Sequence, residues 1–241
     1  AQEMGKEDIY KKYIERSQNY INVFDGATRF FRGKRMDGNW ESPFNPLAVG
    51  RAYTEATAWQ YRFFVPHDVN GMIQLFGGKE EFVAALDDIF NTDAEIHGNL
   101  VDITGLIGQY VHGNEPSHHI AYLYNYVGEP WKTQKMSRRL LNEMYHPTPE
   151  GIIGNEDCGQ MSAWYILSSM GLYSVCPGSN EYVLTTPLFE KVVVHLANGR
   201  TLTILANDPQ KNIYITKVEL NGKQIDTNFI TYDCLMGGGE L

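Results

Sequence analysis

The sequence predicts a mainly α fold that ends in an antiparallel β tail, and a change of pattern along its 241 residues indicates where the two meet. Up to about residue 175, apolar residues recur every three to four positions, which is typical of helices that bury one face. From residue 176 onward they alternate in short runs between Asn-Gly pairs, which is typical of strands joined by tight turns. We therefore expect a helical region at 1–175 and a β tail at 176–241.

The helical pattern is carried by four segments, at residues 7–24, 79–90, 132–145 and 159–173. The first segment places four apolar residues near one stripe: Ile9, Tyr13, Tyr20 and Phe24. The second and third have charged outer faces. The fourth, "GQMSAWYILSSMGLY", is apolar nearly all round and predicts an inner, buried helix. Outer amphipathic helices combined with an apolar inner helix indicate part of a helical toroid.

Long loops rich in Gly, Pro and Asn separate these helices, at residues 31–46 and 146–159. Loops of this length between helices are usually functional, so we expect a site where they meet. In the tail, strands are predicted at 191–196, 201–206 and 212–225, with turns at Asn198-Gly199 and Asn221-Gly222. We expect these strands to pack on a domain outside this sequence.

Composition excludes several classes of protein. The formal net charge of −9 comes without a basic stripe, which excludes nucleic acid as the partner. No apolar run approaches the roughly 18 residues of a membrane span. The three cysteines fit neither a disulfide framework nor a zinc site. The first residues already belong to a helical pattern, which indicates a fragment of a longer protein.

Three junctions between loops and helices concentrate acidic residues, and the first contains Glu55. This residue lies four positions before Trp59, so on a helix the two share a face. A carboxyl group against an indole loses hydration, which raises its pKa and suits a general acid. The alternative is a first-turn acid that is favoured by the helix dipole.

The second junction is "GNEPSHH", residues 113–119. Ser117 is expected to cap the following helix, with Pro116 at its approach. Asn114 and Glu115 then remain as oxygen donors of the kind that calcium prefers. The two neighbouring histidines cannot both point into the core, so we expect one of them to face a ligand.

The third junction is "GNEDCGQ", residues 154–160. Asp157 and Gln160 have the spacing of a capping box with Asp157 as the cap. Glu156 is surplus to that role, and two neighbouring carboxylates could activate a water molecule. Separated carboxylates, an aromatic platform and a site for a hard cation are together what inverting glycoside hydrolysis requires, with the two carboxyls roughly 6.5–9.5 Å apart.

The sequence resembles glycoside hydrolase family 92, the exo-acting, calcium-dependent α-mannosidases. The resemblance is carried by "AWQYRFFVPHD", "HGNEPSHHIAYLYNYVGEPWKTQ" and "GIIGNEDCGQMSAWYILSSMGLYSVCPGSNEYVL", and it extends over essentially the whole chain. It implies that residues 1–175 are part of an (α/α)6 catalytic barrel, and that the tail packs on an N-terminal β-sandwich outside this sequence. It also implies removal of terminal α-linked mannose from mannosides or N-glycans with inversion, and a periplasmic, secreted or cell-surface bacterial protein.

The resemblance also implies roles for individual residues. Glu55 matches the general acid, although Ala56-Thr57 replaces the Gly-Asn of the family's block. Asp157 matches the general base, with Glu156 assisting it or taking its place. Calcium is implied at Asn114 and Glu115, with Gln109 as a further ligand. The mannose pocket is implied at Trp59, His67, Asp68, His118 and His119. Gly113 lies where contacts to the leaving-group sugar are expected, and a glycine offers none.

Two other functions fit parts of the sequence. A polysaccharide lyase with a Tyr and His pair would need a basic pocket for uronic acids, which the negative charge disfavours. A calcium-dependent sugar-binding module would use Asn114 and Glu115 but has no use for Glu55 and Asp157.

Overall fold

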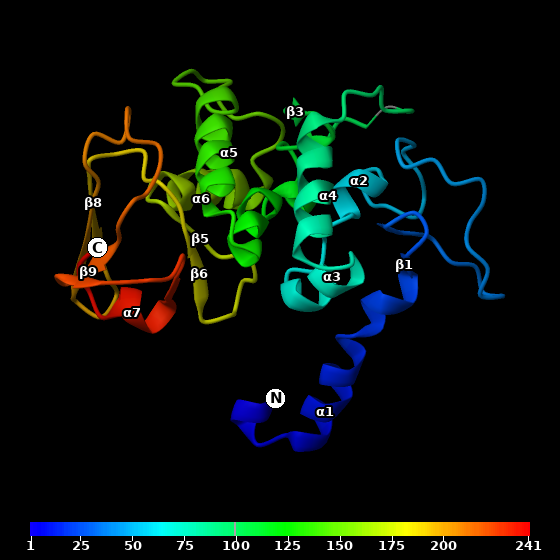
Figure 1. Cartoon of the computed structure of the whole chain (residues 1–241), viewed down its shortest axis with the longest axis horizontal. Coiled ribbons are helices and arrows are strands. Elements are labelled where there is room, and N and C mark those ends of the chain that lie inside the picture. The colour runs from blue at the N-terminus through cyan, green and yellow to red at the C-terminus, as the bar shows by residue number, and fades with distance from the viewer. Residues whose placement is uncertain (99) are drawn as a thin grey trace.

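A computed structural model describes residues 1–98 and 100–241 (Figure 1). The α-helices are α1 (Glu7–Arg16), α2 (Ala58–Tyr61), α3 (Val69–Leu75), α4 (Lys79–Asn91), α5 (Pro130–Glu143), α6 (Gln160–Ser169) and α7 (Tyr232–Met236). The 3₁₀ helices are η1 (Gln2–Met4), η2 (Asn19–Val23), η3 (Glu115–Ser117), η4 (Ile120–Val127) and η5 (Asp157–Gly159). The strands are β1 (Phe24–Asp25), β2 (Phe30–Phe31), β3 (Leu106–Ile107), β4 (Tyr110–Val111), β5 (Leu172–Tyr173), β6 (Glu181–Leu184), β7 (Lys191–His195), β8 (Thr201–Leu205), β9 (Glu219–Leu220), β10 (Lys223–Gln224), β11 (Phe229–Thr231) and β12 (Gly239–Glu240).

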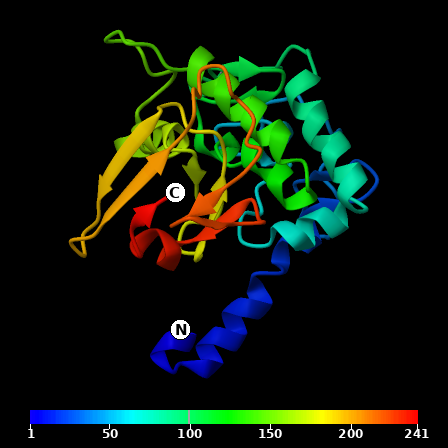
Figure 2. The ribbon, with the colours of Figure 1, turned by 60° about the vertical axis from the view of Figure 1, so that its left-hand side comes forward.

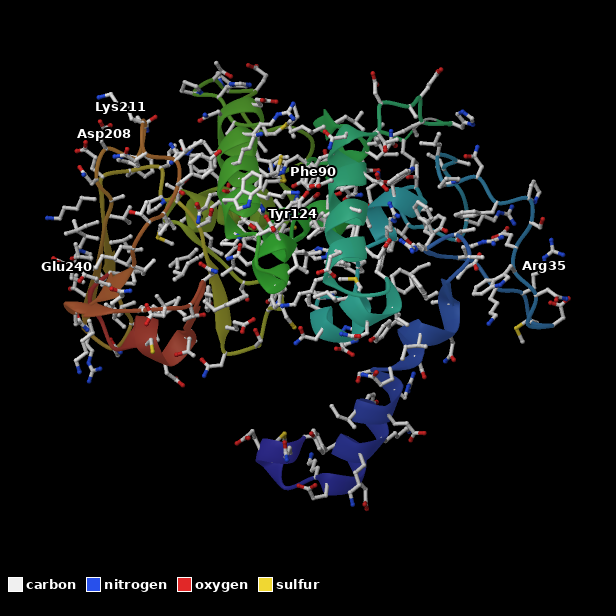
Figure 3. The ribbon with its side chains drawn as sticks, in the orientation of Figure 1. Arg35, Phe90, Tyr124, Asp208, Lys211 and Glu240 are labelled. Atoms are coloured by element: carbon white, nitrogen blue, oxygen red, sulfur yellow. The ribbon has the colours of Figure 1, made fainter. Side chains whose placement is uncertain are left out.

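The centre of the helical region is η4, which packs against both α4 and α5. The predicted amphipathic helices at residues 79–90 and 132–145 are confirmed, because α4 and α5 each bury one face. Phe90 of α4 and Tyr124 of η4 stack at the contact, with ring centroids 6.4 Å apart (Figure 3). The result is a helix-rich body whose core is continuous from β2 to β6.

The predicted helix at residues 7–24 is divided. It ends at Arg16 and continues as the separate 3₁₀ helix η2. Tyr20 and Phe24 pack against the core, whereas Tyr13 is 57% exposed. Helix α1 projects from the body with no buried residue (Figures 1 and 2). The expectation of one common stripe is therefore right only for its second half.

Helix α6 differs in part from its prediction. It does bury Met161 and Trp164, but Ile166 on its other side is 56% exposed. The prediction of a helix buried all round is therefore wrong for the described chain. In α5, by contrast, Arg138 is buried and donates to the carbonyl oxygens of Pro187 at 2.7 Å and Pro209 at 2.8 Å. These bonds hold the loops of the β tail against the helical body.

The β tail forms three small sheets, ordered β11-β6-β5, β12-β8-β7 and β10-β9. Both predicted turns are confirmed: one joins β7 to β8, and Asn221-Gly222 joins β9 to β10 with φ values of 52° and 75°. The pairing is not wholly antiparallel, because β12 runs parallel to β8. The predicted strand at 212–225 is also shorter, because the Ile215 amide donates to the Gln134 side chain rather than to a strand.

Strand β5 joins the tail to the body. It directly follows α6 and pairs antiparallel with β6. Tyr173 of β5 stacks on Tyr122 of η4, with centroids 4.2 Å apart and planes at 7°. The tail is thus anchored within this chain by the central aromatic core.

Two glycines test this anchoring. Gly171, before β5, has φ +82°, and a Cβ there would lie 2.6 Å from the Thr185 carbonyl oxygen. Gly199, in the β7–β8 turn, has φ +81° and open space around it. Gly199→Ala should lower the unfolding free energy by about 1–2 kcal/mol from backbone strain alone. Gly171→Ala should cost about 1–3 kcal/mol more, because it adds overpacking. Denaturant unfolding of both variants measures the difference, and equal losses would contradict the crowding at Gly171.

Candidate functional site

The position of Glu55 is fixed by the start of α2. Thr57 is the N-cap: its hydroxyl accepts from the Trp59 amide at 3.3 Å, and its own amide donates to Gln60 Oε1 at 2.7 Å. Glu55 lies ahead of this capping box, outside the helix, exposed and at φ +55°. The expectation that Glu55 and Trp59 share a helix face is therefore wrong, and so is the first-turn alternative. The Glu55 carboxylate therefore takes no part in capping α2.

Asn114 joins the second junction to the first. Its side chain is buried and caps η3, with Oδ1 accepting from the Glu115 amide at 3.2 Å. Its Nδ2 donates to the Glu55 carbonyl oxygen at 3.0 Å, across 59 residues of sequence. Ser117, predicted to be the cap, instead accepts from the Val111 amide at 3.3 Å within the core. Asn114 caps η3, whereas η4, the helix that follows Ser117, has His119 as its N-cap without a side-chain bond.

Glu115 follows this cap with its side chain exposed, and Pro116 stands in the first turn of η3 as expected. The exposed carboxylate and the capping amide oxygen therefore come from neighbouring residues of one junction.

The third junction assigns its acids differently from the prediction. Glu156 Oε1 accepts from the Ser162 amide at 3.1 Å, so Glu156 is the acid that satisfies the start of α6. Hydrogen bonds from Ser162 also lower the pKa of the Glu156 carboxyl. Gly159 is the N-cap of α6, so the predicted capping box of Asp157 with Gln160 is wrong. Asp157 is exposed at φ +53°, next to Cys158 at φ +55°.

Both histidines of "GNEPSHH" point into the protein, so the expectation that they cannot both do so is wrong. His118 is 2% exposed and His119 is 4% exposed. Ring nitrogen Nε2 of His118 bonds to the His112 carbonyl oxygen at 2.8 Å, and that of His119 bonds to the Phe63 carbonyl oxygen at 2.7 Å. Burial lowers the pKa of each to about 4. Both rings are therefore neutral near pH 7.

The other predicted pocket residues lie in different surroundings. Trp59 is 9% exposed, meets Phe30 edge-on at 5.1 Å, and has a buried Nε1 with no partner among the described residues. His67 bonds to the Ser17 carbonyl oxygen at 2.9 Å. Asp68 caps α3 and accepts from Tyr20 at 2.8 Å. The hydrogen bonds of His67 and Asp68 thus lead to the N-terminal segment and not to the junction of Glu55 with Asn114.

Gln109 anchors a loop. Its Nε2 donates to the Thr92 carbonyl oxygen at 3.2 Å and to the Ala94 carbonyl oxygen at 2.8 Å. Its backbone oxygen accepts from Gln60 Nε2 at 2.6 Å, which ties Gln109 to the capping box that follows Glu55 in the sequence. Its Oε1 is buried and has no partner among the described residues.

Gly113 is required by packing. A Cβ there would lie 2.0 Å from Thr104 Oγ1, so any side chain at this position would have to displace Thr104. A Cβ at Gly154 would lie 2.9 Å from the Gly113 carbonyl oxygen. The loop that carries Asp157 therefore lies directly against the segment that carries Asn114.

The segment 109–119 thus contacts both remaining junctions, and the structure brings Glu55, Asn114 and the Asp157 loop to one region. Sequence reasoning missed Thr57 and Gln60, although their spacing is that of a capping box. It also missed Gln160 as a side chain that reaches another segment, donating from Nε2 to His118 Nδ1 at 3.1 Å. Nothing in the local sequence indicates that contact.

Neither a cluster of metal-ligating side chains nor a membrane-spanning helix is present in the part of the chain that the structure describes. No group of three or more His, Cys, Asp or Glu side chains there could hold a metal ion by itself. No described helix is both long and apolar enough to cross a membrane.

The sequence profile described as the glycosyl hydrolase family 92 catalytic domain matches residues 1–241, the whole chain. The chain belongs to glycosyl hydrolase family 92. The resemblance in "AWQYRFFVPHD" and the two longer blocks is therefore confirmed.

Solved structures and curated proteins agree with this membership. A family 92 α-mannosidase from Bacteroides thetaiotaomicron is 41% identical with a TM-score of 0.91, over 100% of this chain and 31% of its own. A family 92 inverting mannosidase from Bacteroides thetaiotaomicron VPI-5482 is 38% identical with a TM-score of 0.88, over 100% of this chain and 34% of its own. A protein of Arthroderma benhamiae named "Uncharacterized secreted glycosidase" is 31% identical over 99% of this chain and 32% of its own. This family 92 chain spans about a third of the length of these relatives.

The buried histidines predict how stability of this family 92 chain depends on pH. The pKa of His119 is about 4 in the folded protein and near 6.5 in an unfolded chain. Between these values the unfolded state binds more protons, so the unfolding free energy should fall as the pH drops from 6.5 towards 4. His119→Asn should reduce this slope, by up to about 2 kcal/mol between pH 6.5 and 5. Denaturant unfolding across this range measures the slope, and an unchanged slope would show that His119 protonates in the folded state.

Proposed function

We propose that this chain is the later catalytic part of an enzyme that removes terminal α-linked mannose from mannosides or N-glycans, with inversion and with calcium. The observation that carries the proposal is the convergence on segment 109–119, where Asn114 bonds to the Glu55 backbone and the Asp157 loop packs against Gly113. Two of the relatives described above are an α-mannosidase and an inverting mannosidase, which supports the same chemistry here.

Glu55 is the proposed general acid. Its side chain is exposed, it stands outside α2, and its backbone is held at φ +55° by the bond from Asn114. Residues in that region of backbone space cost about 1–3 kcal/mol, and such strain gathers at functional sites. A carboxyl group placed in this way can deliver its proton to the oxygen of a departing sugar.

Asp157 is the proposed general base. Of the two neighbouring acids, Glu156 already accepts from the Ser162 amide, and these hydrogen bonds lower the pKa of its carboxyl. Asp157 is exposed and its backbone also has positive φ. We therefore assign activation of water to Asp157 and positioning of the loop to Glu156. In an inverting enzyme the two working carboxyls stand roughly 6.5–9.5 Å apart, leaving room for that water.

Calcium fits the donor chemistry of Asn114 and Glu115. The Glu115 carboxylate is exposed, and Asn114 Oδ1 keeps a second lone pair after accepting from the Glu115 amide. Carboxylate and amide oxygens are the ligands that calcium takes. The unpartnered Oε1 of Gln109 is a further donor of the same kind. When bound, the ion would orient neighbouring hydroxyls of the terminal mannose.

We further propose that the helices are part of an (α/α)6 barrel, with a boundary near residue 175, and that an N-terminal β-sandwich of the parent chain packs on the tail. Exposed apolar side chains on α1, Ile9, Tyr13 and Ile14, support a covering partner. A cavity of about 530 Å³ within the tail, lined in part by Ile204, Tyr214 and Val218, supports a contact of the tail with that sandwich. The Bacteroides relative supports a bacterial protein, and the secreted relative from Arthroderma benhamiae supports one that is periplasmic, secreted or at the cell surface.

Substitution of the acids separates catalysis from sugar binding. In the full-length parent enzyme, Glu55→Gln and Asp157→Asn should each lower kcat by about 10²–10⁴-fold, because each removes one proton transfer. Glu156→Gln should lose far less, because its amide oxygen can still accept from Ser162. Steady-state hydrolysis of an aryl α-mannoside measures all three. A sugar-binding module would show no turnover to lose, and equal losses at 156 and 157 would overturn the assignment of the base.

Removal of the metal tests the calcium proposal. A chelator should abolish mannoside hydrolysis by the parent enzyme, and added calcium should restore it. Glu115→Gln should weaken calcium binding in calorimetry, because it removes a charged ligand. Glu150→Gln, at an exposed acid of the neighbouring loop, is the matched control and should bind calcium normally. Full activity in the presence of the chelator would contradict the calcium proposal.

A further inference from the structure

A chain of buried and partly buried hydrogen bonds joins segment 109–119 to the start of α6. Tyr110 Oη bonds to His112 Nδ1 at 2.9 Å, and His112 Nε2 bonds to Tyr145 Oη at 2.8 Å. Tyr145 in turn donates to the Met161 carbonyl oxygen at 3.2 Å. This order requires His112 to accept at Nδ1 and donate from Nε2, so the ring is neutral in a single tautomer.

His118 makes the second connection. Its Nε2 faces the His112 carbonyl oxygen at 2.8 Å and so carries the proton, which leaves Nδ1 to accept from Gln160 Nε2 at 3.1 Å. The backbone oxygen of His118 also accepts from Trp164 Nε1 at 3.0 Å. Segment 109–119 is therefore tied to α6 at its first residue and again one turn later.

The tie to Gln160 lies next to the proposed general base. Gln160 is the first residue of α6, and the two residues at positive φ, Asp157 and Cys158, immediately precede Gly159 and this helix. Burial lowers the pKa of His118 to about 4, and the nearby charge of Asp157 opposes that lowering. Backbone in this conformation persists only where its surroundings hold it.

We infer that the hydrogen bond between His118 and Gln160 is a clasp that positions Asp157 relative to Asn114 and Glu115. His118 and Gln160 are then positioning residues, which act through the base and the metal ligands without touching the sugar. This inference rests on the proposed function. It replaces the direct contact with mannose that the sequence predicts for His118, because the ring is buried and both of its nitrogens are occupied.

Two variants release the clasp. In His118→Gln the amide nitrogen can reach the place of Nε2 and keep the bond to His112, while the acceptor for Gln160 is lost. Gln160→Met keeps the length of the side chain and removes the donor. In the full-length parent enzyme each should lower kcat by about 10–100-fold with KM nearly unchanged, since a misplaced group of about 1 Å costs this much. Each should also raise the calcium Kd in calorimetry by about tenfold, as loss of an outer support of metal ligands does.

Ser168→Ala is the matched control. It removes a buried bond of 2.5 Å between Tyr122 and the other end of α6. It should lower Tm as His118→Gln does, with kcat and calcium Kd unchanged. The double variant His118→Gln, Gln160→Met should be no worse in kcat than either single variant, because both remove one bond.

All kinetics are measured well below the Tm of each variant, so that a loss of folded protein cannot imitate a loss of rate. A fall in Tm with kcat and calcium Kd both unchanged, or additive losses in the double variant, would overturn the clasp while leaving the proposed function intact. A wild-type parent enzyme that neither binds calcium nor cleaves mannosides would instead overturn the proposed function.

Discussion

The geometry of the candidate site depends on the burial of one polar stretch. Between residues 109 and 119 the chain buries three histidines, an asparagine, a glutamine and a serine. A buried polar group without a partner costs about 1–3 kcal/mol, and each of these side chains makes at least one hydrogen bond. Several of the partner atoms come from regions far apart in sequence, among them the carbonyl oxygens of Glu55 and Phe63 and the side-chain amide of Gln160. The hydrogen bonds that pair these buried side chains therefore also bring the surrounding loops together.

Much of the fold could be predicted because it depends on local pattern. Helices α4 and α5 follow from apolar residues at helical spacing, and the tail turns follow from Asn-Gly pairs. The prediction failed where partners come from far along the chain. The shortened strand before residue 219 is one case. There the Ile215 amide donates to the Gln134 side chain and not to a neighbouring strand. Spacing alone carries no signal of such a competitor.

The site was predictable as a set of junctions but not in its assignments. The sequence shows that acids gather before α2, η3 and α6, and the structure brings those junctions together. Which of two adjacent acids satisfies a helix start depends on backbone angles, and here Glu156 does so while Asp157 does not. The prediction that His118 and His119 cannot both point into the core failed for a similar reason. Neighbouring side chains point in different directions, but segment 109–119 has protein on more than one side, so both directions are interior.

Both proposed working acids occupy backbone that glycine and asparagine enter readily and that branched side chains resist. A replacement at position 55 or 157 must therefore tolerate a positive φ before its effect on catalysis can be measured. A valine at either place would lose activity even in an enzyme that needed no proton there. Asparagine at 157 is the cleaner probe, because it accepts the same torsion angles as aspartate and differs chiefly in its charge.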